Sequence, residues 1–252
     1  MKKMPCWRWP TRCSSNRAVE GKTVPCTSLS EMDDVKRSIQ AVIFDLDGVL
    51  VDTEPLVVRA WQEILVPFGR PLDEQDIYYI MGIDEETTNR YILEKTGLPM
   101  DLETSTRIHR QHLARLFAQE LRLAEGAQAL LESLAGRGLA LAIASNSRAE
   151  YVDQMLQDMG LRPYFQALAT REHATHGKPA PDLYLAAARL LGVPPQACLA
   201  VEDSAVGLQA AVAAGMGCLV IAPADGVAQD FSLALARAGS LPELAHEMEK
   251  FL

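Results

Sequence analysis

The sequence predicts an α/β protein in which a parallel sheet, with strands alternating with helices, is interrupted by a long helical insert. Three observations predict this arrangement. Short, continuous apolar runs recur along the chain, helical patterns separate them, and residues 54–124 contain helical patterns without a convincing strand. Uninterrupted apolar strands that alternate with helices are typical of a parallel sheet covered on both faces. A chain of 252 residues is long enough for such a core and an insert.

The first apolar run, residues 40–44, is expected to form a strand that leads into the segment Asp45–Asp52. Thr53 is expected to cap the N-terminus of the following helix, with Pro55 in its first turn. The apolar face predicted for this helix consists of Leu56, Ala60, Ile64 and Phe68.

The rest of the insert is expected to be helical as well. The segments DEQDIYYI (73–80) and DEETTNRYILEKTG (84–97) begin with acidic residues, which favour helix N-termini. The segment DLETSTRIHRQHLARLFAQEL (101–121) carries a broad apolar face, made of Ile108, Leu113, Leu116, Phe117 and Leu121.

After Gly126 the pattern changes to strands and helices in alternation. We expect helices at 127–135, 148–159, 181–191 and 205–214, and strands at 139–145, 167–170, 198–203 and 218–222. The α/β core is therefore expected to comprise residues 39–53 and 125–252, and the helical insert residues 54–124.

The N-terminal segment, residues 1–38, differs from the rest of the chain. Up to Ser30 it holds six lysines and arginines and a single acid, without apolar periodicity. It resembles an organelle transit peptide, but a disordered tail or a translation start at Met32 explains it more simply. We therefore expect a cytoplasmic protein, with a plastid or other organelle as the alternative if this segment is a transit peptide.

Composition excludes several classes of function. The net charge of -9 offers no basic surface for nucleic acid or anionic lipid. The longest apolar run, 210–224, is broken by Gly215 and Gly217 and is shorter than the roughly 20 residues of a membrane span. Five cysteines without a CxxC pair predict neither a disulfide framework nor structural zinc, and they favour a reducing compartment.

Polar residues follow the predicted strands where a parallel sheet binds its ligands, at the carboxyl ends of the strands. The residues expected at this edge are Asp45, Asp47, Ser145, Asn146, Lys178, Glu202 and Asp203. For most of them a structural explanation competes. Ser145-Asn146 and Glu202-Asp203-Ser204 could cap the following helices, and a single loop lysine is usually solvated. The aspartate pair is harder to explain in this way, because residues two apart on a strand face the same side.

Together these residues make chemical sense as a phosphoryl-transfer site. Asp45, Asp47 and one or both of Glu202 and Asp203 supply the hard oxygen ligands that Mg²⁺ prefers. Lys178 and the Ser145 hydroxyl can bind phosphoryl oxygens, and Gly48 lets the backbone approach the phosphate closely.

Four motifs carry a family resemblance: DLDGVLVDTEP, ASNS, GKPAPD and VEDSAVG, in this order over residues 39–252. The chain resembles the haloacid dehalogenase (HAD) superfamily, in the branch with a helical cap that includes phosphoglycolate phosphatase and β-phosphoglucomutase. The resemblance implies a Rossmann-like parallel-sheet core with an inserted all-helical cap domain. It also implies a nucleophile that forms an aspartyl-phosphate (Asp45) and a general acid and base (Asp47). The implied Mg²⁺ ligands are Asp45, the Asp47 carbonyl, Asp203 and Glu202.

The cap residues Gly82, Ile83, Asp84 and Glu85 are implied by the family to close over the substrate and to set specificity. His109 and His112 lie three residues apart on a predicted helix and are a possible metal pair, but no third ligand is evident. His173 and His176 precede Lys178 and are expected to be surface residues of a loop.

The resemblance leaves three functions to compare. The first is a Mg²⁺-dependent phosphatase, expected to be a monomer or weak dimer, that acts on a small sugar or organic-acid phosphate. The second is a phosphomutase, in which an arginine follows the cap glycine by three positions and a histidine lies in the first cap helix. Here those positions hold Glu85 and Val57, which disfavours the mutase. A receiver-type phosphoacceptor is a remote third, because it would not need a helical cap.

Overall fold

The computed structural model describes residues 39–80, 85–222 and 229–252. Its centre is a six-stranded sheet in the order β3-β2-β1-β4-β5-β6, and every neighbouring pair is parallel. The strands are β1 (Ala41–Phe44), β2 (Ala140–Ala144), β3 (Ala167–Ala169), β4 (Cys198–Glu202), β5 (Gly217–Ile221) and β6 (Ala236–Ala238). The predicted α/β parallel-sheet class is confirmed. The short edge strand β6 was not predicted, because a three-residue segment with an exposed arginine gives no apolar run.

The strands bury side chains on both faces, which explains why they are apolar without alternation. In β1, Val42 and Phe44 join one apolar cluster, whereas Ala41 and Ile43 join another. The same alternation holds in β2, where Leu141 and Ile143 face the first cluster. The sheet therefore has a hydrophobic core on each side, as a parallel sheet covered by helices requires.

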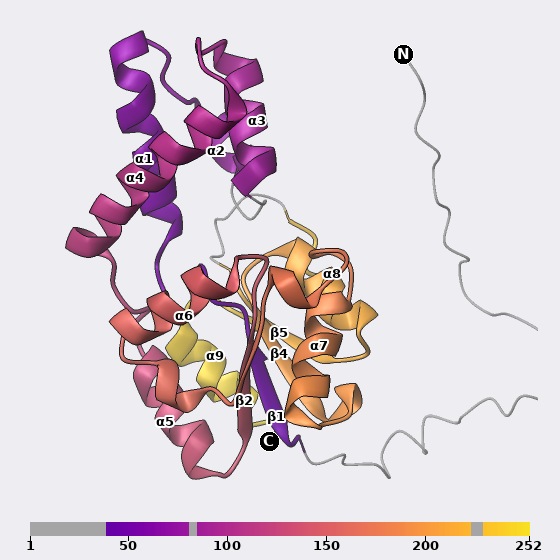
Figure 1. The fold of residues 1–252 in the computed structure, drawn as a ribbon. Helices are drawn as coiled ribbons and strands as arrows, with labels where there is room; N and C mark the ends of the chain where they lie inside the picture. Colours follow the sequence, from indigo (N-terminus) through magenta and orange to yellow (C-terminus); the bar gives the residue numbers. More distant parts are fainter. Residues whose placement is uncertain (1–38, 81–84, 223–228) are drawn as a thin grey trace, which may run out of the picture. The chain divides into compact units, whose positions relative to one another are not determined.

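Helices cover both faces (Figure 1). The first cluster includes side chains of α5 (Ala127–Gly136), α6 (Ala149–Asp158) and α9 (Leu241–Met248). The second includes those of α7 (Asp182–Leu191) and α8 (Ala205–Ala213), and it is rich in alanine. Each of these helices follows a strand and its connection, so its N-terminal turn lies toward the carboxyl ends of the strands.

In its described residues, the cap segment forms helices joined by turns and short loops, without a β-strand. Its helices are α1 (Glu54–Leu65), α2 (Glu74–Ile80), α3 (Glu85–Thr96) and α4 (Leu102–Glu120). Leu56, Ala60 and Ile64 are buried as predicted. The prediction for Phe68 is wrong, because this side chain is 44% exposed. The reason is that α1 ends at Leu65, and the chain then forms a 3-10 turn that ends at Gly69 in the left-handed conformation.

The helix α4 belongs to two hydrophobic clusters at once. Ile108 packs against the cap's own cluster, which is built around Trp61 and Ile92. Leu116, further along the same helix, and Leu121, its C-cap residue, are buried in the cluster on the sheet. The apolar face predicted for 101–121 is thus used by two different partners, and α4 connects the cap to the core.

The two segments that lead into and out of the cap lie side by side. Val51 forms an antiparallel bridge with Leu123. The Asp52 N–H donates to the Arg122 carbonyl at 3.2 Å, and the Ala124 N–H donates to the Leu50 carbonyl at 2.9 Å. This pairing comes directly after the loop that carries Asp45 and Asp47, so the cap connections begin at the candidate site.

The apolar run 210–224 was predicted to be a helix end, a turn and a strand. Its described part forms the end of α8, a turn at Gly215 and β5. Among the described helices, none has the length and apolar character that crossing a membrane would need. Cys198 and Cys218 are buried free thiols.

Candidate active site

Asp45 lies at the point where the strand order reverses, between β1 and β4, and this is where open α/β sheets bind ligands. Its N–H donates to the Val201 carbonyl of β4 at 2.9 Å, which continues the sheet by one residue. Leu46 is completely buried, whereas the Asp45 side chain is 14% exposed. As predicted, Leu46 points into the core, whereas the neighbouring Asp45 side chain points toward the edge of the sheet.

Lys178 binds two carboxylates with one ammonium group. Its Nζ lies 2.6 Å from Asp45 Oδ1 and 2.6 Å from Glu202 Oε1, and the lysine side chain is only 5% exposed. The loop is held by Asn146, whose Oδ1 accepts the Lys178 N–H at 2.9 Å. A Cβ on Gly177 would lie 2.6 Å from the same oxygen, so glycine permits this approach. The interpretation of Lys178 as a solvated surface residue is wrong.

Glu202 is completely buried and bound on several sides. Its Oε1 also accepts the Tyr184 hydroxyl at 2.6 Å. Its Oε2 accepts the Ser204 hydroxyl at 3.3 Å. A Cβ on Gly207, in the first turn of α8, would lie 1.9 Å from the Glu202 carboxyl carbon. Glu202 thus positions the Lys178 ammonium group and packs against the first turn of α8.

Gly48 brings the loop after β1 against Asp203. Its φ is +76°, a conformation that favours glycine, and a Cβ there would lie 1.9 Å from Asp203 Oδ2. The glycine of the DLDG segment is therefore required by the close approach of Asp203.

The acidic residues fit a divalent cation. One carboxylate oxygen from each of Asp45, Glu202 and Asp203 lies within 4.8 Å of the others. Oxygen is the only donor type in this set, which matches the preference of Mg²⁺. The Asp47 carboxylate is not part of this group. A contribution of the Asp47 backbone carbonyl stays a prediction.

Burial and neighbouring charges shift the pKa values of Asp45 and Lys178. Burial raises the pKa of Asp45 to about 7, and the nearby charges of Glu202 and Asp47 add to the rise, while Lys178 opposes it. Burial by itself would lower the pKa of Lys178, but Asp45 and Glu202 outweigh this and raise it, so the lysine stays protonated. Among the described residues, Lys178 binds the carboxylates of both Asp45 and Glu202, and a metal ion bound beside them would neutralise further negative charge.

Two hydroxyl groups hold the Asp47 side chain. The Tyr151 hydroxyl donates to Asp47 Oδ1 at 3.0 Å, and the Thr53 side chain also hydrogen-bonds this carboxylate. Burial raises the pKa of Asp47, and both hydrogen bonds oppose the rise. The prediction for Thr53 needs correction, because it occupies the N-cap position of α1 without a capping side-chain bond. Its side chain binds Asp47.

Ser145 and Asn146 do not cap the helix that follows them. The N-cap of α6 is Arg148, and Ser145 Oγ accepts the Ser147 N–H at 3.1 Å. Ser145 is 2% exposed and lies directly after β2. The capping interpretation is correct for Ser204, which accepts the Gly207 N–H at the start of α8, but it does not extend to Glu202 and Asp203.

The cap residue Glu85 forms an ion pair with Arg110 of α4, with Arg110 Nε 2.8 Å from Glu85 Oε1 and a second contact from the same guanidinium. The other cap positions expected to contact substrate, Gly82, Ile83 and Asp84, lie outside the described residues. The role of Glu85 in substrate binding stays a prediction.

The comparisons with known proteins agree with this geometry. The family described as haloacid dehalogenase-like hydrolases matches residues 42–221. This chain belongs to that family. The matched range of the hydrolase runs from β1 to β5 and includes every predicted site residue.

Two relatives of the hydrolase are named as phosphatases. Hexitol phosphatase B of Escherichia coli K12 is 34% identical over 226 residues, which cover 82% of this chain and 95% of that protein. The fructose-1-phosphate phosphatase YqaB of Escherichia coli K12 is 33% identical over 178 residues, or 69% of this chain and 92% of that protein. The hydrolase is therefore a phosphoric monoester hydrolase of this family.

A solved structure has the same fold. CbbY from Rhodobacter sphaeroides, in complex with phosphate, aligns with a TM-score of 0.71 at 28% identity, over 82% of this chain and 96% of that chain.

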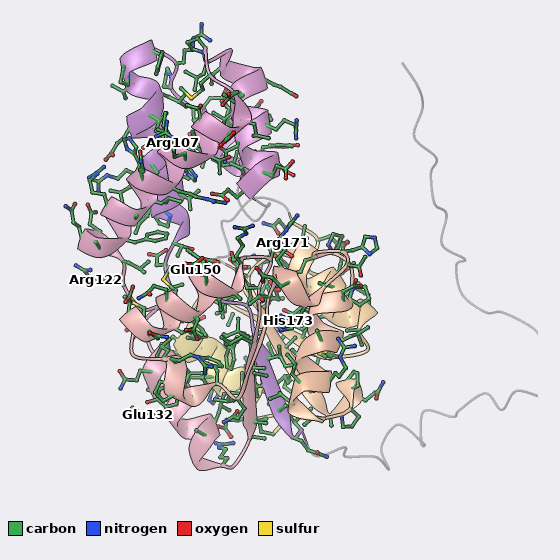
Figure 2. The ribbon with its side chains drawn as sticks, in the orientation of Figure 1. Arg107, Arg122, Glu132, Glu150, Arg171 and His173 are labelled. Carbon is green, nitrogen blue, oxygen red and sulfur yellow. The ribbon has the colours of Figure 1, made fainter. Side chains whose placement is uncertain are left out.

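Four histidines that the sequence singled out lie outside the carboxylate cluster of the site. His109 stacks on Trp61 with ring centroids 4.4 Å apart, and burial lowers its pKa to about 4. His112 Nδ1 lies 3.3 Å from Glu63 Oε2, so the two histidines face different partners. His173, labelled in Figure 2, accepts the Thr170 N–H at 3.2 Å in a capping box. His176 is 75% exposed, as expected for a surface loop.

Three residues whose side chains bind the carboxylates of the site were not predicted to do so: Thr53, Tyr151 and Tyr184. Thr53 was assigned to the helix cap, and the tyrosines looked like residues of amphipathic helices. The available signal was position, because each lies in or next to the first turn of a helix that starts at the carboxyl edge of the sheet.

Proposed function

We propose that this phosphatase hydrolyses small phosphorylated metabolites, of the sugar or organic-acid phosphate type, through an aspartyl-phosphate on Asp45. The observation that carries this proposal is the contact between Lys178 Nζ and Asp45 Oδ1 at 2.6 Å, with Asp47 two residues further along the same edge. A buried lysine beside a carboxylate can orient it and can neutralise an incoming phosphoryl group.

The reaction proceeds in two steps, both carried by residues of this chain. An Asp45 oxygen forms a bond to phosphorus, the bond from phosphorus to the leaving oxygen breaks, and Asp47 gives its proton to that oxygen. Asp47 then takes a proton from a water molecule, which attacks the phosphorus of the aspartyl-phosphate and releases inorganic phosphate and free Asp45. Lys178 and Ser145 bind the phosphoryl oxygens, and the Gly48 and Asn146 segments shape the space around them.

The proposal includes Mg²⁺, held by Asp45, Asp203, the Asp47 carbonyl and Glu202. When bound, the ion would neutralise negative charge on the phosphoryl group and on the carboxylates. Glu202 contributes mainly its charge here, because its oxygens already accept hydrogen bonds from Lys178, Tyr184 and Ser204.

Metal removal provides the first test. Phosphate release is expected to fall to background in EDTA and to return with Mg²⁺. Ca²⁺ is expected to inhibit, because it prefers six to eight oxygens at about 2.3–2.6 Å, whereas Mg²⁺ takes about 2.0–2.1 Å. Full activity in EDTA would contradict the metal requirement while leaving the aspartyl-phosphate route open.

The substrate class rests on the relatives, whose names specify fructose 1-phosphate and hexitol phosphate. A panel containing fructose 1-phosphate, a hexitol phosphate, phosphoglycolate and glucose phosphates, assayed for released phosphate, would identify the preferred ester. Activity on phosphoproteins or nucleotides alone would contradict the proposed class.

A phosphomutase is the alternative, and cap contacts disfavour it. A mutase must bind a bisphosphate and so needs free cationic groups in the cap. Arg90 is paired with Glu86 at 3.0 Å, and Arg59 with Glu63 and Glu120. Arg110 is paired with Glu85, and Val57 packs against the cap cluster, where it can relay no proton.

We therefore expect phosphate release from β-glucose 1-phosphate or other monophosphates, with little conversion of β-glucose 1-phosphate to glucose 6-phosphate even when a bisphosphate is added. A coupled assay for glucose 6-phosphate measures the second reaction. Isomerisation faster than hydrolysis would replace the phosphatase proposal with the mutase. A receiver would instead hold its phosphoryl group for a long time, whereas a phosphatase releases it repeatedly.

We also propose that the enzyme works as a monomer or weak dimer in the cytoplasm, without nucleic-acid or membrane partners. Support comes from the net charge of -9 and from the two buried free thiols, which suit a reducing compartment. Light scattering of the full chain at assay concentration measures the oligomeric state, and a stable higher oligomer would contradict this.

A further inference from the structure

Tyr151 connects the proposed proton-transfer residue to the helix that returns from the cap. Its hydroxyl donates to Asp47 Oδ1 at 3.0 Å across 104 residues of sequence. Its ring lies against Phe117 of α4, with ring centroids 6.4 Å apart and an angle of 47° between the planes. The ring of Tyr151 is thus held by packing while its hydroxyl points to the carboxylate.

The other hydroxyl on Asp47 comes from the opposite connection. Thr53 immediately precedes α1, the helix that leads into the cap, and it also hydrogen-bonds the Asp47 carboxylate. The Asp47 carboxylate is therefore bound by two hydroxyls. One belongs to Thr53, at the connection into the cap, and the other to Tyr151, whose ring packs on the helix that returns from the cap. The environment of Asp45 is different, because Lys178 Nζ binds its carboxylate directly.

We propose that Tyr151 is a positioning residue for Asp47, fixing the carboxyl group in the orientation from which it protonates the leaving oxygen. This inference rests on the proposed role of Asp47 as general acid and base. A carboxyl group that loses one of its two hydroxyl donors can rotate away from the reacting atoms. Small losses of alignment cost large factors in rate. The hydroxyl of Tyr151, rather than its ring, carries the function.

The substitution Tyr151→Phe keeps the ring and removes only the hydroxyl. Two substrates separate positioning from a structural role, because they differ in their need for a general acid. An alkyl phosphate leaves as an alkoxide that must be protonated, whereas p-nitrophenyl phosphate leaves as a stable nitrophenolate. The alkyl probe is the fastest wild-type substrate among fructose 1-phosphate, a hexitol phosphate and phosphoglycolate.

We expect Tyr151→Phe to lower kcat/KM for the alkyl phosphate about 10- to 100-fold, a part of the roughly 10²–10⁴-fold that general acid catalysis contributes. For p-nitrophenyl phosphate, kcat/KM reports the first step and is expected to stay within about threefold, since little protonation is needed. The melting temperature checks that the variant is folded. An equal loss with both substrates, including one caused by unfolding, would show a structural role and overturn the inference, as would no loss with either.

Two further variants complete the experiment. Tyr164→Phe is the matched control, because the Tyr164 hydroxyl also donates to a carboxylate, that of Glu132 at 3.1 Å on the surface. Glu132 is labelled in Figure 2, apart from Glu150. This control is expected to leave both reactions unchanged.

Asp47→Asn tests the role of Asp47 separately from the role of Tyr151. It should show the same preferential loss of alkyl phosphate hydrolysis, and a larger one than Tyr151→Phe. If Asp47→Asn hydrolyses the alkyl phosphate normally, the proposed role of Asp47 fails. If Asp47→Asn shows the selective loss and Tyr151→Phe does not, only the role of Tyr151 fails.

Discussion

The substitution Asp45→Asn is expected to abolish phosphatase activity, with a loss of at least about 10⁴-fold in kcat, of the kind seen when a covalent nucleophile is removed. An amide cannot form the aspartyl-phosphate. The fold should remain intact, because burial raises the pKa of Asp45 to about 7 and its charged form is therefore costly in the folded protein. A neutral amide is expected to keep or raise the melting temperature in metal-free buffer.

Released phosphate measures the activity, and mass spectrometry must show that the asparagine has not deamidated to aspartate. A matched control is Asp153→Asn, which removes the surface ion pair with Arg162 at 2.7 Å and should leave turnover unchanged. Near-normal turnover by intact Asp45→Asn would refute the nucleophile.

The substitution Lys178→Met is expected to lower both activity and stability. The ammonium group is the shared partner of Asp45 and Glu202, whose side chains are 14% and 1% exposed. Without it, two buried carboxylates face each other, and the cation proposed to bind the phosphoryl oxygens is lost. We expect kcat/KM to fall about 10³-fold, as when one strong transition-state donor is lost. The free energy of unfolding should fall by about 3–5 kcal/mol, the cost of breaking a buried ion pair from one side.

Urea unfolding in metal-free buffer measures this stability change, and phosphate release with saturating Mg²⁺ measures the activity. Lys250→Met is the comparison, because Lys250 also pairs with a carboxylate, that of Glu247 at 2.5 Å, but on the surface. That variant should be indistinguishable from wild type in both assays. An unfolding midpoint of Lys178→Met equal to that of wild type would show that Lys178 is not needed to balance these carboxylates.

The aspartate pair and its edge of the sheet could be predicted from the sequence alone. Asp45 and Asp47 follow a continuous apolar strand, and the other candidates follow strands or precede helices of the same pattern. The apolar pattern of a strand, and the polar residues that follow it, can be read from a short stretch of sequence. In a parallel sheet the carboxyl ends of all strands lie at the same edge, so these polar residues come together. For this reason, Lys178, Glu202 and Asp203 could be placed together with Asp45 although more than 130 residues separate them in sequence.

The side-chain partners within the site were decided by the tertiary structure. Thr53 has the sequence position of a helix cap, yet its side chain binds Asp47. Tyr151 and Tyr184 lie in the first turns of their helices, a position that places them near the carboxyl edge but does not say which groups their hydroxyls meet. In the structure these hydroxyls bind Asp47 and Glu202. Likewise, the single apolar face of α4 is divided between two clusters. Local patterns determine which face of an element is buried, but the partner that it meets depends on distant segments brought together by packing.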